Sequence, residues 1–253
     1  MIESPQFPLD IEATVVTDPA AITSTVEWVL LSVKAHQTPG AAEWLSRLCG
    51  ADTKVLVVQN GIEHDLADAY TNGAPTIPTV VYCGAELLEP GHIKHSSAGH
   101  LFVPDQPYGD ALLELFAESQ AEVRPTSAFA TEKWRKLSFN VLLNGLTALT
   151  GRTLSVVGDP AIRPIAIETV RECWQIARAD GADLDPDGAE AIIDRLINSG
   201  NDGGTSMLYD TRAGRPTEHD AIHGSALRRA EALGIDTPTI RFIHGILDAR
   251  SRA

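Results

Sequence analysis

The chain has 253 residues, of which 43% are hydrophobic and 21% charged, and its formal net charge is -14 at pH 7. This acidic balance disfavours binding to nucleic acid or to an anionic membrane, whereas a small anionic ligand needs only a local positive site. There is no apolar run of roughly 18 residues, no apolar signal segment and only three scattered cysteines, so the sequence predicts a cytoplasmic protein with reduced thiols.

The first half of the chain alternates between predicted strands and helices. A strand is expected at 11–16, and Asp18 followed by proline is typical of the N-cap and first turn of a short helix. Near-continuous apolar runs at 27–33 and 54–58 predict strands buried on both faces, as in a parallel sheet. Further strands are expected at 79–83, 92–97 and 121–123, and helices at 39–49, 63–70 and 112–119. The alternation indicates a doubly wound α/β layer.

The second half is predicted to be helical throughout, because no strand pattern is found from Pro125 onward. Helical patterns cover 127–150, 160–180, 186–199, 205–212, 217–233 and 238–250. Helix starts are indicated by the Asp-Pro pairs at 159–160 and 185–186, and helix ends by Gly181, Gly200 and Gly234. We therefore predict two domains, 1–124 and 125–253, with the boundary near 124–126.

The predicted helix at 131–150 carries a polar stripe. Lys136, Asn140 and Asn144 stand four residues apart, so one ammonium and two carboxamides share one face. Asparagine is a mediocre helix former, and two of them among leucines indicate half-buried polar groups directed at a ligand. An ordinary polar edge of an amphipathic helix explains the same spacing.

Lys34 and Asn60 follow the two apolar strands directly. Ligands of open α/β sheets bind outside the carboxyl ends of the strands, so both positions are candidates for binding. A solvated loop lysine and an Asn-Gly turn are the plainer interpretation of these residues taken singly.

Three polar features of the helical half also suggest a site. Ser206 lies near a predicted helix N-terminus, where an anion can be held, although Thr205 or Ser206 acting as a simple cap is the plainer interpretation. Glu218 is expected in the first turn of a helix capped by Thr217, where a carboxylate is favourable in any case. His219 and His223 have the spacing of two metal ligands but lack a third, so we interpret them as surface or packing histidines.

Taken together, these segments resemble the ketopantoate reductase (2-dehydropantoate 2-reductase) family. The resemblance spans nearly the whole chain in the family's order. It rests on SVKAHQT at 32–38, VVQNGI at 57–62, EPGHIKH at 89–95, EKWRKLSFNVLLNGLTALT at 132–150, SMLYDTRAGRPTEHDAIHG at 206–224 and GIDTP at 234–238. It implies an incomplete Rossmann-like NADPH domain followed by an all-helical domain, with the active site in the cleft between them and a homodimer formed through the long helices.

The resemblance also implies a role for each candidate residue. Lys136 matches the catalytic lysine, and Glu218 matches an acidic residue near the cofactor and the reacting centre. Asn140, Asn144 and Ser206 match residues that bind the substrate. Lys34 and Asn60 match cofactor contacts, and Asn60 also lies near the substrate. The implied reaction is the reduction of ketopantoate to pantoate by NADPH.

This chemistry suits the residue types. A hydride that reaches a carbonyl carbon leaves negative charge on the oxygen, which a nearby ammonium such as that of Lys136 stabilises and protonates. The amides of Asn140 and Asn144 orient hydroxyl and carboxylate groups without adding charge. The carboxylate of Glu218 can hold Lys136 or a substrate hydroxyl in place.

Two departures from the family pattern leave alternatives open. The 26 residues before the first apolar strand contain no glycine, so the G-x-G-x-x-G turn of the family is missing from the sequence. Leu154 stands where the family has a further asparagine, ten residues after Asn144, which leaves another 2-keto acid open as the substrate beside ketopantoate. The alternative function is a defective or non-catalytic relative that binds a small acid or serves in assembly.

Overall fold

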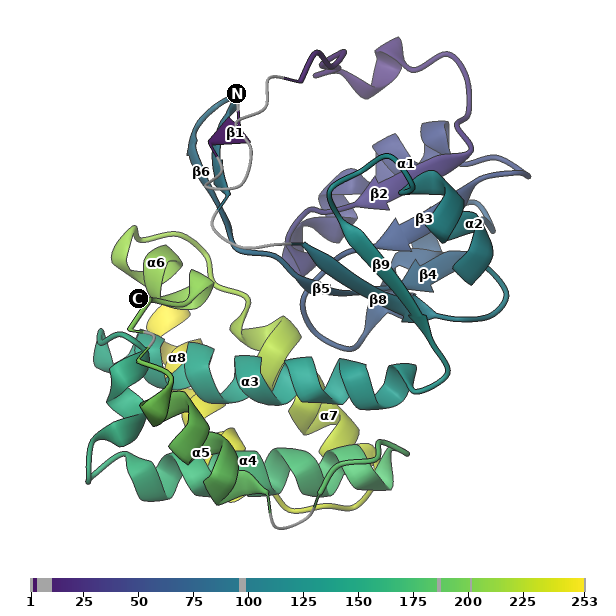
Figure 1. Ribbon diagram of the computed structural model, residues 1–253. Coiled ribbons are helices and arrows are strands. Elements are labelled where there is room, and N and C mark those ends of the chain that lie inside the picture. The colour runs from purple at the N-terminus through teal and green to yellow at the C-terminus, as the bar shows by residue number, and fades with distance from the viewer. Residues whose placement is uncertain (1, 4–10, 96–98, 186–187, 201, 253) are drawn as a thin grey trace. The chain divides into compact units, whose positions relative to one another are not determined.

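The computed structural model of the chain describes residues 2–3, 11–95, 99–185, 188–200 and 202–252 (Figure 1). The chain divides into two compact units. The first comprises Met1–Gln59 and His64–Phe129, and the second comprises Asn60–Glu63 and Ala130–Ala253. The short segment Asn60–Glu63 therefore belongs to the second unit, although both of its chain neighbours belong to the first.

The centre of the first unit is a parallel three-stranded sheet. Its strands are β2 (Trp28–Leu31), β3 (Lys54–Val57) and β4 (Thr76–Pro78), in that order. The last three residues of β3 are fully buried, as the apolar run predicted. The register pairs Leu31 with Val57, so β2 and β3 end side by side.

The third predicted strand, 79–83, forms over 80–82, although it is not the neighbour of β3. The strand beside β3 is β4, and β5 (Val80–Tyr82) belongs to a second sheet with β8 (His100–Pro104) and β9 (Glu122–Thr126). A third sheet contains β1 (Ile2–Glu3), β7 (His92–His95) and β6 (Ala85–Glu89). The predicted strand at 92–97 forms as β7 over 92–95, and the placement of 96–97 lies outside the described residues.

The strand expected at 11–16 does not form, because these residues are exposed and have no paired strand. The predicted short helix at 18–19 does form, as a 3-10 turn at Pro19–Ala21, and the Asp18 side chain accepts a hydrogen bond of 2.8 Å from Ala20 N. The other helices of the first unit are short. They are the 3-10 segments Ala35–Ala41 and His64–Tyr70, α1 (Ala42–Leu48) and α2 (Gly109–Leu115).

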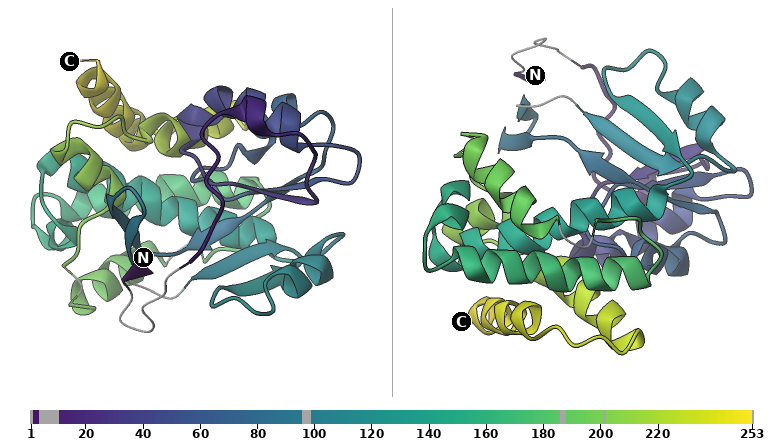
Figure 2. Two further views of the ribbon diagram at one scale, coloured as in Figure 1. Left: turned by 90° about the horizontal axis from the view of Figure 1, so that it is seen from above. Right: turned by 60° about the horizontal axis from the view of Figure 1, so that its bottom comes forward.

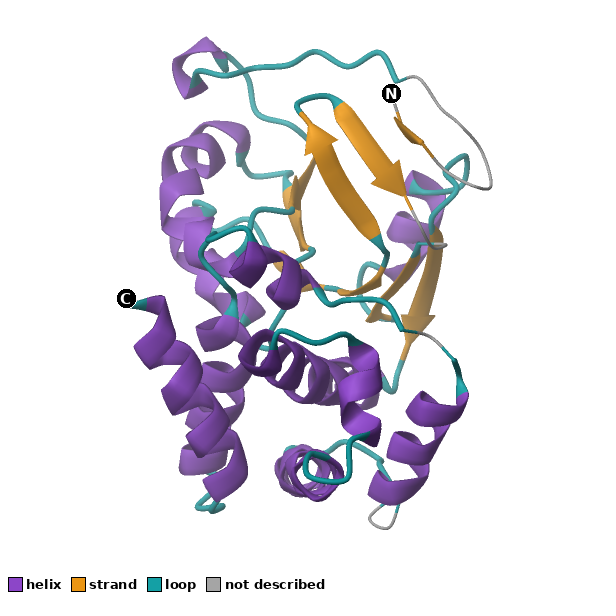
Figure 3. Cartoon of the chain, turned by 90° about the vertical axis from the view of Figure 1, so that its left-hand side faces the viewer, coloured by secondary structure: helices purple, strands orange, loops and turns teal. Residues whose placement is uncertain are grey.

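The described residues of the second unit form helices and loops without a strand (Figures 2 and 3). The helices are α3 (Phe129–Thr150), α4 (Arg163–Ala179), α5 (Ala189–Asn198), α6 (Ser206–Arg212), α7 (Ser225–Ala232) and α8 (Pro238–Ser251), with a 3-10 segment at Leu154–Gly158 and a π-helical turn at Asp220–Gly224. The three glycines predicted to end helices have positive φ angles of 87°, 65° and 67°, respectively, at Gly181, Gly200 and Gly234. The predicted fold class is confirmed.

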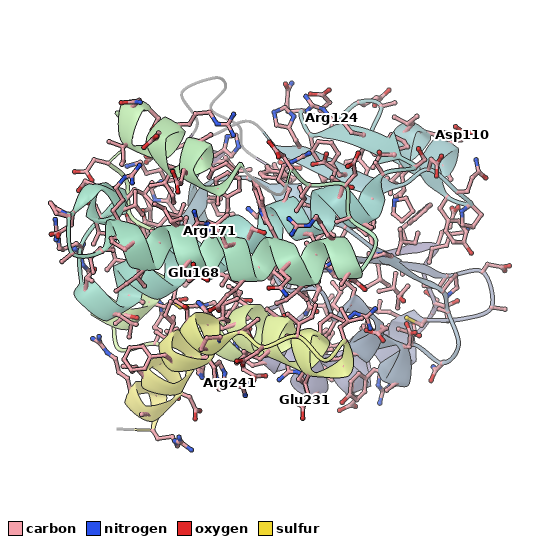
Figure 4. The ribbon with its side chains drawn as sticks, turned by 90° about the horizontal axis from the view of Figure 1, so that it is seen from below. Asp110, Arg124, Glu168, Arg171, Glu231 and Arg241 are labelled. Atoms are coloured by element: carbon pink, nitrogen blue, oxygen red, sulfur yellow. The ribbon has the colours of Figure 1, made fainter. Side chains whose placement is uncertain are left out.

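Helix α3 is the centre of the second unit's core. Its apolar side chains at helical spacing are buried, and they are Trp134, Leu137, Val141, Leu142 and Leu146. A contact of 3.3 Å from Ser138 Oγ to Cys173 Sγ places α3 beside α4, and α8 packs against α4 as well (Figure 2). On the solvent side of α4, Glu168 and Arg171 lie beside each other (Figure 4).

Among the helices that the structure describes, none combines the length and the apolar character needed to cross a lipid bilayer.

Candidate functional site

The polar stripe predicted on α3 is present on an unbroken helix. Lys136 and Asn140 are half-buried, and only 4% of Asn144 is exposed. Because the helix is continuous over 129–150, the spacing of four residues keeps the three side chains on one face. The stripe therefore descends from the half-buried Lys136 towards the core at Asn144.

Asn60 lies against this stripe. Its Nδ2 donates a hydrogen bond of 3.0 Å to Glu218 Oε2, and its Oδ1 accepts one of 3.4 Å from Asn140 Nδ2. All three residues belong to the second unit, because Asn60 is part of the segment 60–63. The structure thus brings three predicted site residues from distant parts of the sequence into one connected polar row.

Glu218 is held differently from the prediction. The expected N-cap, Thr217, pairs through its hydroxyl with His219 Nδ1 at 2.9 Å, and the helical residues begin only at His219. Glu218 therefore lies before the helix and not in its first turn. With 8% of its surface exposed, its carboxylate accepts a hydrogen bond from Asn60, a contact that sequence periodicity could not show.

Ser206 is the exposed first residue of α6, and the residue before it is the cap. The Thr205 hydroxyl accepts a hydrogen bond of 3.1 Å from Leu208 N, which is the plainer interpretation given above. The same hydroxyl lies 2.7 Å from Thr147 Oγ1 on α3. Sequence reasoning missed Thr147, although its position eleven residues after Lys136 continues the stripe.

Lys34 lies in the first unit, in the turn after β2, and is half-buried. Gln59 joins this turn to the end of β3, since its Nε2 donates to Val33 O at 2.9 Å and to Thr38 Oγ1 at 2.8 Å. The carboxyl ends of β2 and β3 thus lie together, as the sequence predicted.

A dinucleotide fits these turns only in part. The turn 32–34 contains no glycine, and β2 is an edge strand of its sheet among the described residues. The other turn contains Gly61, whose backbone packs against the carbonyl oxygen of Ala221, also in the second unit. The described residues therefore supply strand ends and Lys34, and they do not supply a glycine-rich cradle for a pyrophosphate.

The two histidines near Glu218 have structural partners. His223 is fully buried, and its Nε2 donates a hydrogen bond of 2.9 Å to Val141 O on α3. Burial lowers the pKa of His223 to about 3, so its imidazole is neutral. Among the described residues, no three His, Cys, Asp or Glu side chains come close enough together to hold a metal ion.

Two family models match the chain. The model described as ketopantoate reductase PanE/ApbA covers residues 3–107, and that of the C-terminal region of the same family covers residues 128–251. A 2-dehydropantoate 2-reductase from Mycobacterium tuberculosis is 33% identical over 245 residues, which is 96% of this chain and 83% of the relative. The chain belongs to the ketopantoate reductase family.

Solved structures of this family agree with the fold. A family member from Ralstonia eutropha JMP134 has a TM-score of 0.89 at 27% identity, with 99% of this chain and 84% of that chain covered. A ketopantoate reductase from Staphylococcus aureus, described as dimeric, has a TM-score of 0.87 at 25% identity and covers 99% of this chain and 86% of its own.

Proposed function

We propose that this chain is a cytoplasmic oxidoreductase that reduces the keto group of ketopantoate, or of a similar 2-keto acid, to the 2-hydroxy acid with NADPH. The observation that carries the proposal is the polar row of Asn140, Asn60 and Glu218 beside Lys136 on α3. Membership of a family of reductases supports the same reaction. The nicotinamide supplies the hydride when it is bound.

Lys136 is the proposed catalytic acid. As negative charge develops on the carbonyl oxygen, its ammonium stabilises that charge and then transfers one proton to the oxygen, which leaves the alcohol and a neutral amine. The amine regains its proton from solvent. Its half-buried position on α3 suits this role, because electrostatic stabilisation is stronger where water is partly excluded.

The carboxamides position the substrate in this proposal. Asn140 and Asn144 each offer donors and an acceptor to the hydroxyl and carboxylate groups of the acid. Ser206, exposed at the start of α6, offers a hydroxyl to the substrate carboxylate. The link between Thr205 and Thr147 fixes the start of α6 against α3 and so fixes Ser206 relative to the stripe.

Glu218 and Asn60 act together in the proposal. Asn60 holds the Glu218 carboxylate in place, and that carboxylate in turn orients Lys136 or a substrate hydroxyl near the reacting centre. Lys34, Asn60 and Glu218 are also the proposed contacts to the cofactor. These roles rest on the family resemblance and on the hydrogen bonds of Asn60.

Leu154 is the reason why the proposed substrate includes 2-keto acids other than ketopantoate. It stands at the family's further asparagine, begins the 3-10 segment Leu154–Gly158, and bonds through its backbone N to Gly203 O at 3.0 Å. An isobutyl side chain cannot hydrogen-bond a substrate hydroxyl, so related 2-keto acids belong in any assay. We also propose a homodimer, as described for the Staphylococcus aureus relative.

The first test separates a reductase from a non-catalytic binder. NADPH fluorescence is titrated with the 253-residue chain, and turnover is measured with ketopantoate and other 2-keto acids. Micromolar NADPH affinity with turnover is the expected result. If the chain turns over none of the acids, the proposed reaction is wrong and the non-catalytic alternative stands.

The second test concerns Lys136. Lys136→Ala is expected to lower kcat by about a thousandfold or more while leaving NADPH affinity within about threefold, because a proton donor and an oxyanion partner are lost together. Lys133→Ala removes the same charge from the same helix, where the ammonium lies 3.8 Å from Asp180, and is expected to keep kcat within about twofold. Loss of NADPH binding in folded Lys136→Ala would contradict the assigned role.

A further inference from the structure

The segment Asn60–Glu63 is held by the second unit along its whole length. Asn60 begins it with the hydrogen bonds to Glu218 and Asn140, and Ile62 packs against the core of the second unit. Gln59 and His64, on either side, belong to the first unit. Four residues are therefore fixed in place by side chains distant in sequence, and Asn60 is one of them.

Gly61 permits a very close approach. Its φ angle is 100°, and a Cβ atom added there would lie 2.5 Å from Ala221 O. Ala221 belongs to the π-helical turn Asp220–Gly224, a rare geometry that is frequent at functional sites. The backbone of the segment thus rests on the turn that directly follows Glu218 and His219.

Arg228 on α7 holds both sides of this contact. Its Nε donates to Glu63 Oε1 at 2.7 Å and its Nη2 to Glu63 Oε2 at 2.6 Å, a two-pronged pairing that fixes orientation as well as distance. Its Nη1 donates to Asp220 Oδ1 at 3.0 Å. These hydrogen bonds raise the pKa of the Arg228 guanidinium above its ordinary value, so it keeps its charge.

The position of Arg228 connects the two partners of the Asn60–Glu218 hydrogen bond. Glu63 is three residues after Asn60, and Asp220 is two residues after Glu218. Arg228 therefore ties together the two chain segments that carry the donor and the acceptor. Because 47% of the Arg228 side chain and 29% of the Glu63 side chain are exposed, the ion pair itself adds little to global stability. Its effect is on geometry.

We propose that Arg228 and Glu63 are positioning residues, which hold Asn60 against Glu218 and Asn140 in the geometry that the reaction requires. This inference rests on the proposed function. Neither side chain touches substrate in this arrangement, and both act through Asn60. Misplacing a positioned polar group by about 1 Å can cost a hundredfold in rate, so loss of the ion pair is expected to lower kcat/KM by about tenfold.

The test is a double-mutant cycle on the full chain. Glu63→Gln and Arg228→Gln are each expected to lower kcat/KM by about tenfold, and the pair together by no more than about twentyfold, because they remove one interaction. In an Asn60→Ala background, Arg228→Gln is expected to change kcat/KM by less than about twofold. Full additivity of Asn60→Ala and Arg228→Gln would overturn the inference and leave the reductase intact.

Arg229→Gln is the matched control, because this neighbouring arginine pairs with Asp180 and not with the segment 60–63. Arg229→Gln is expected to leave the non-additive effect of Asn60→Ala and Arg228→Gln on kcat/KM unchanged, even if it lowers the stability of the chain. A purely structural role for Arg228 would instead give Arg229→Gln and Arg228→Gln the same kinetic profile, which would overturn the inference.

Amide hydrogen exchange of peptides covering 60–63 supplies a measurement that needs no turnover. Arg228→Gln is expected to speed exchange there by about tenfold and to leave peptides of α4 unchanged. Unchanged exchange at 60–63 would overturn the inference even in an active enzyme. Absence of turnover by the unmodified chain, with faster exchange in the variant, would contradict the proposed function and not the hold of Arg228 on the segment.

Discussion

Gly145 on α3 shows how tightly single residues of the second unit are packed. A Cβ atom there would lie 2.6 Å from His223 Nε2 and 2.8 Å from Ile243 Cγ2, and both of these side chains are buried. Gly145→Ala must therefore displace His223 from its bond to Val141 O, at an expected cost of about 1–3 kcal/mol in the free energy of unfolding.

Gly245 on α8 is the matched control, because a Cβ atom there meets nothing within 4 Å. Gly245→Ala is expected to raise the free energy of unfolding by about 0.5–1 kcal/mol, since alanine favours the helix. Urea unfolding of both variants measures the contrast. Equal stability of the two would show that the close contact at Gly145 relaxes without cost.

His223 makes stability depend on pH. Its pKa is lowered to about 3 by burial, with His244 and His219 adding repulsion, while an unfolded histidine titrates near 6.5. Between these two values the unfolded chain binds a proton that the folded chain does not, so stability falls as pH falls. From pH 7 to pH 5 the contribution of this one residue is a loss of about 2 kcal/mol.

The variant His223→Gln isolates that contribution, because its amide can still donate to Val141 O. The variant is expected to be less stable at pH 7 and to lose less stability between pH 7 and pH 5 than the unmodified chain. The comparison of slopes in urea unfolding removes the contribution of other titrating groups such as His244. Parallel slopes would mean that the pKa of His223 is the same in the folded and the unfolded chain.

At the scale of the residue, the sequence predicted the helix face but not its partners. The spacing of Lys136, Asn140 and Asn144 was sufficient to place them on one stripe, because a helix has a fixed period. The bond from Asn60 to Glu218 depends on tertiary packing between positions 158 residues apart, which no local pattern encodes. The Arg228–Glu63 pair was missed for the same reason.

At the scale of the element, long helices were predicted well and short strands poorly. The helices of the second unit have strong periodicity with glycine stops at positive φ, so their limits agree with the prediction to within a few residues. In the first unit, β6 is exposed along its whole length, and its sequence AELLE shows no alternation of apolar and polar residues. The prediction missed β4, because one extended run changes sheet between Pro78 and Val80.

Helix α8 depends on a carboxylate from another helix. Glu172 on α4 is buried, and its two oxygens accept hydrogen bonds of 2.8 Å from Thr239 N and 2.9 Å from Ile240 N at the start of α8. A negative charge at a helix N-terminus is favourable, and the free amides are satisfied at the same time. Glu172→Gln is therefore expected to lower the free energy of unfolding by about 1–3 kcal/mol.

The control for Glu172 is Glu168, one turn earlier on α4, whose half-exposed side chain approaches Arg171 only to 3.7 Å (Figure 4). Glu168→Gln makes the same chemical change on the solvent face and is expected to stay within about 0.5 kcal/mol of the unmodified chain. Urea unfolding followed by circular dichroism measures both variants. If both variants lose a similar free energy of unfolding, the cause is the change in net charge and not the loss of hydrogen bonds at the start of α8.

At the scale of the whole molecule, the net charge of -14 opposes the proposed anionic substrate. Repulsion extends over a Debye length of about 30 Å at 0.01 M salt and only about 8 Å at 0.15 M, whereas the attraction of Lys136 acts at contact and is screened less. Added salt should therefore speed the association of the keto acid with the protein more than it weakens the attraction between Lys136 and the bound acid. We expect kcat/KM for the keto acid to rise by about two- to fivefold between these salt concentrations, with kcat nearly constant.

Neutralising exposed acids that are not candidate site residues tests the cause. Asp110 and Glu231 are exposed (Figure 4), and Asp110→Asn combined with Glu231→Gln makes the chain less negative by two charges. This double variant should have a higher kcat/KM at 0.01 M salt and a flatter salt dependence, because the long-range field is weaker while Lys136 is untouched. If kcat/KM instead falls steadily with salt in both proteins, local attraction outweighs the field of the whole molecule, and the acidic surface has no influence on how the substrate arrives.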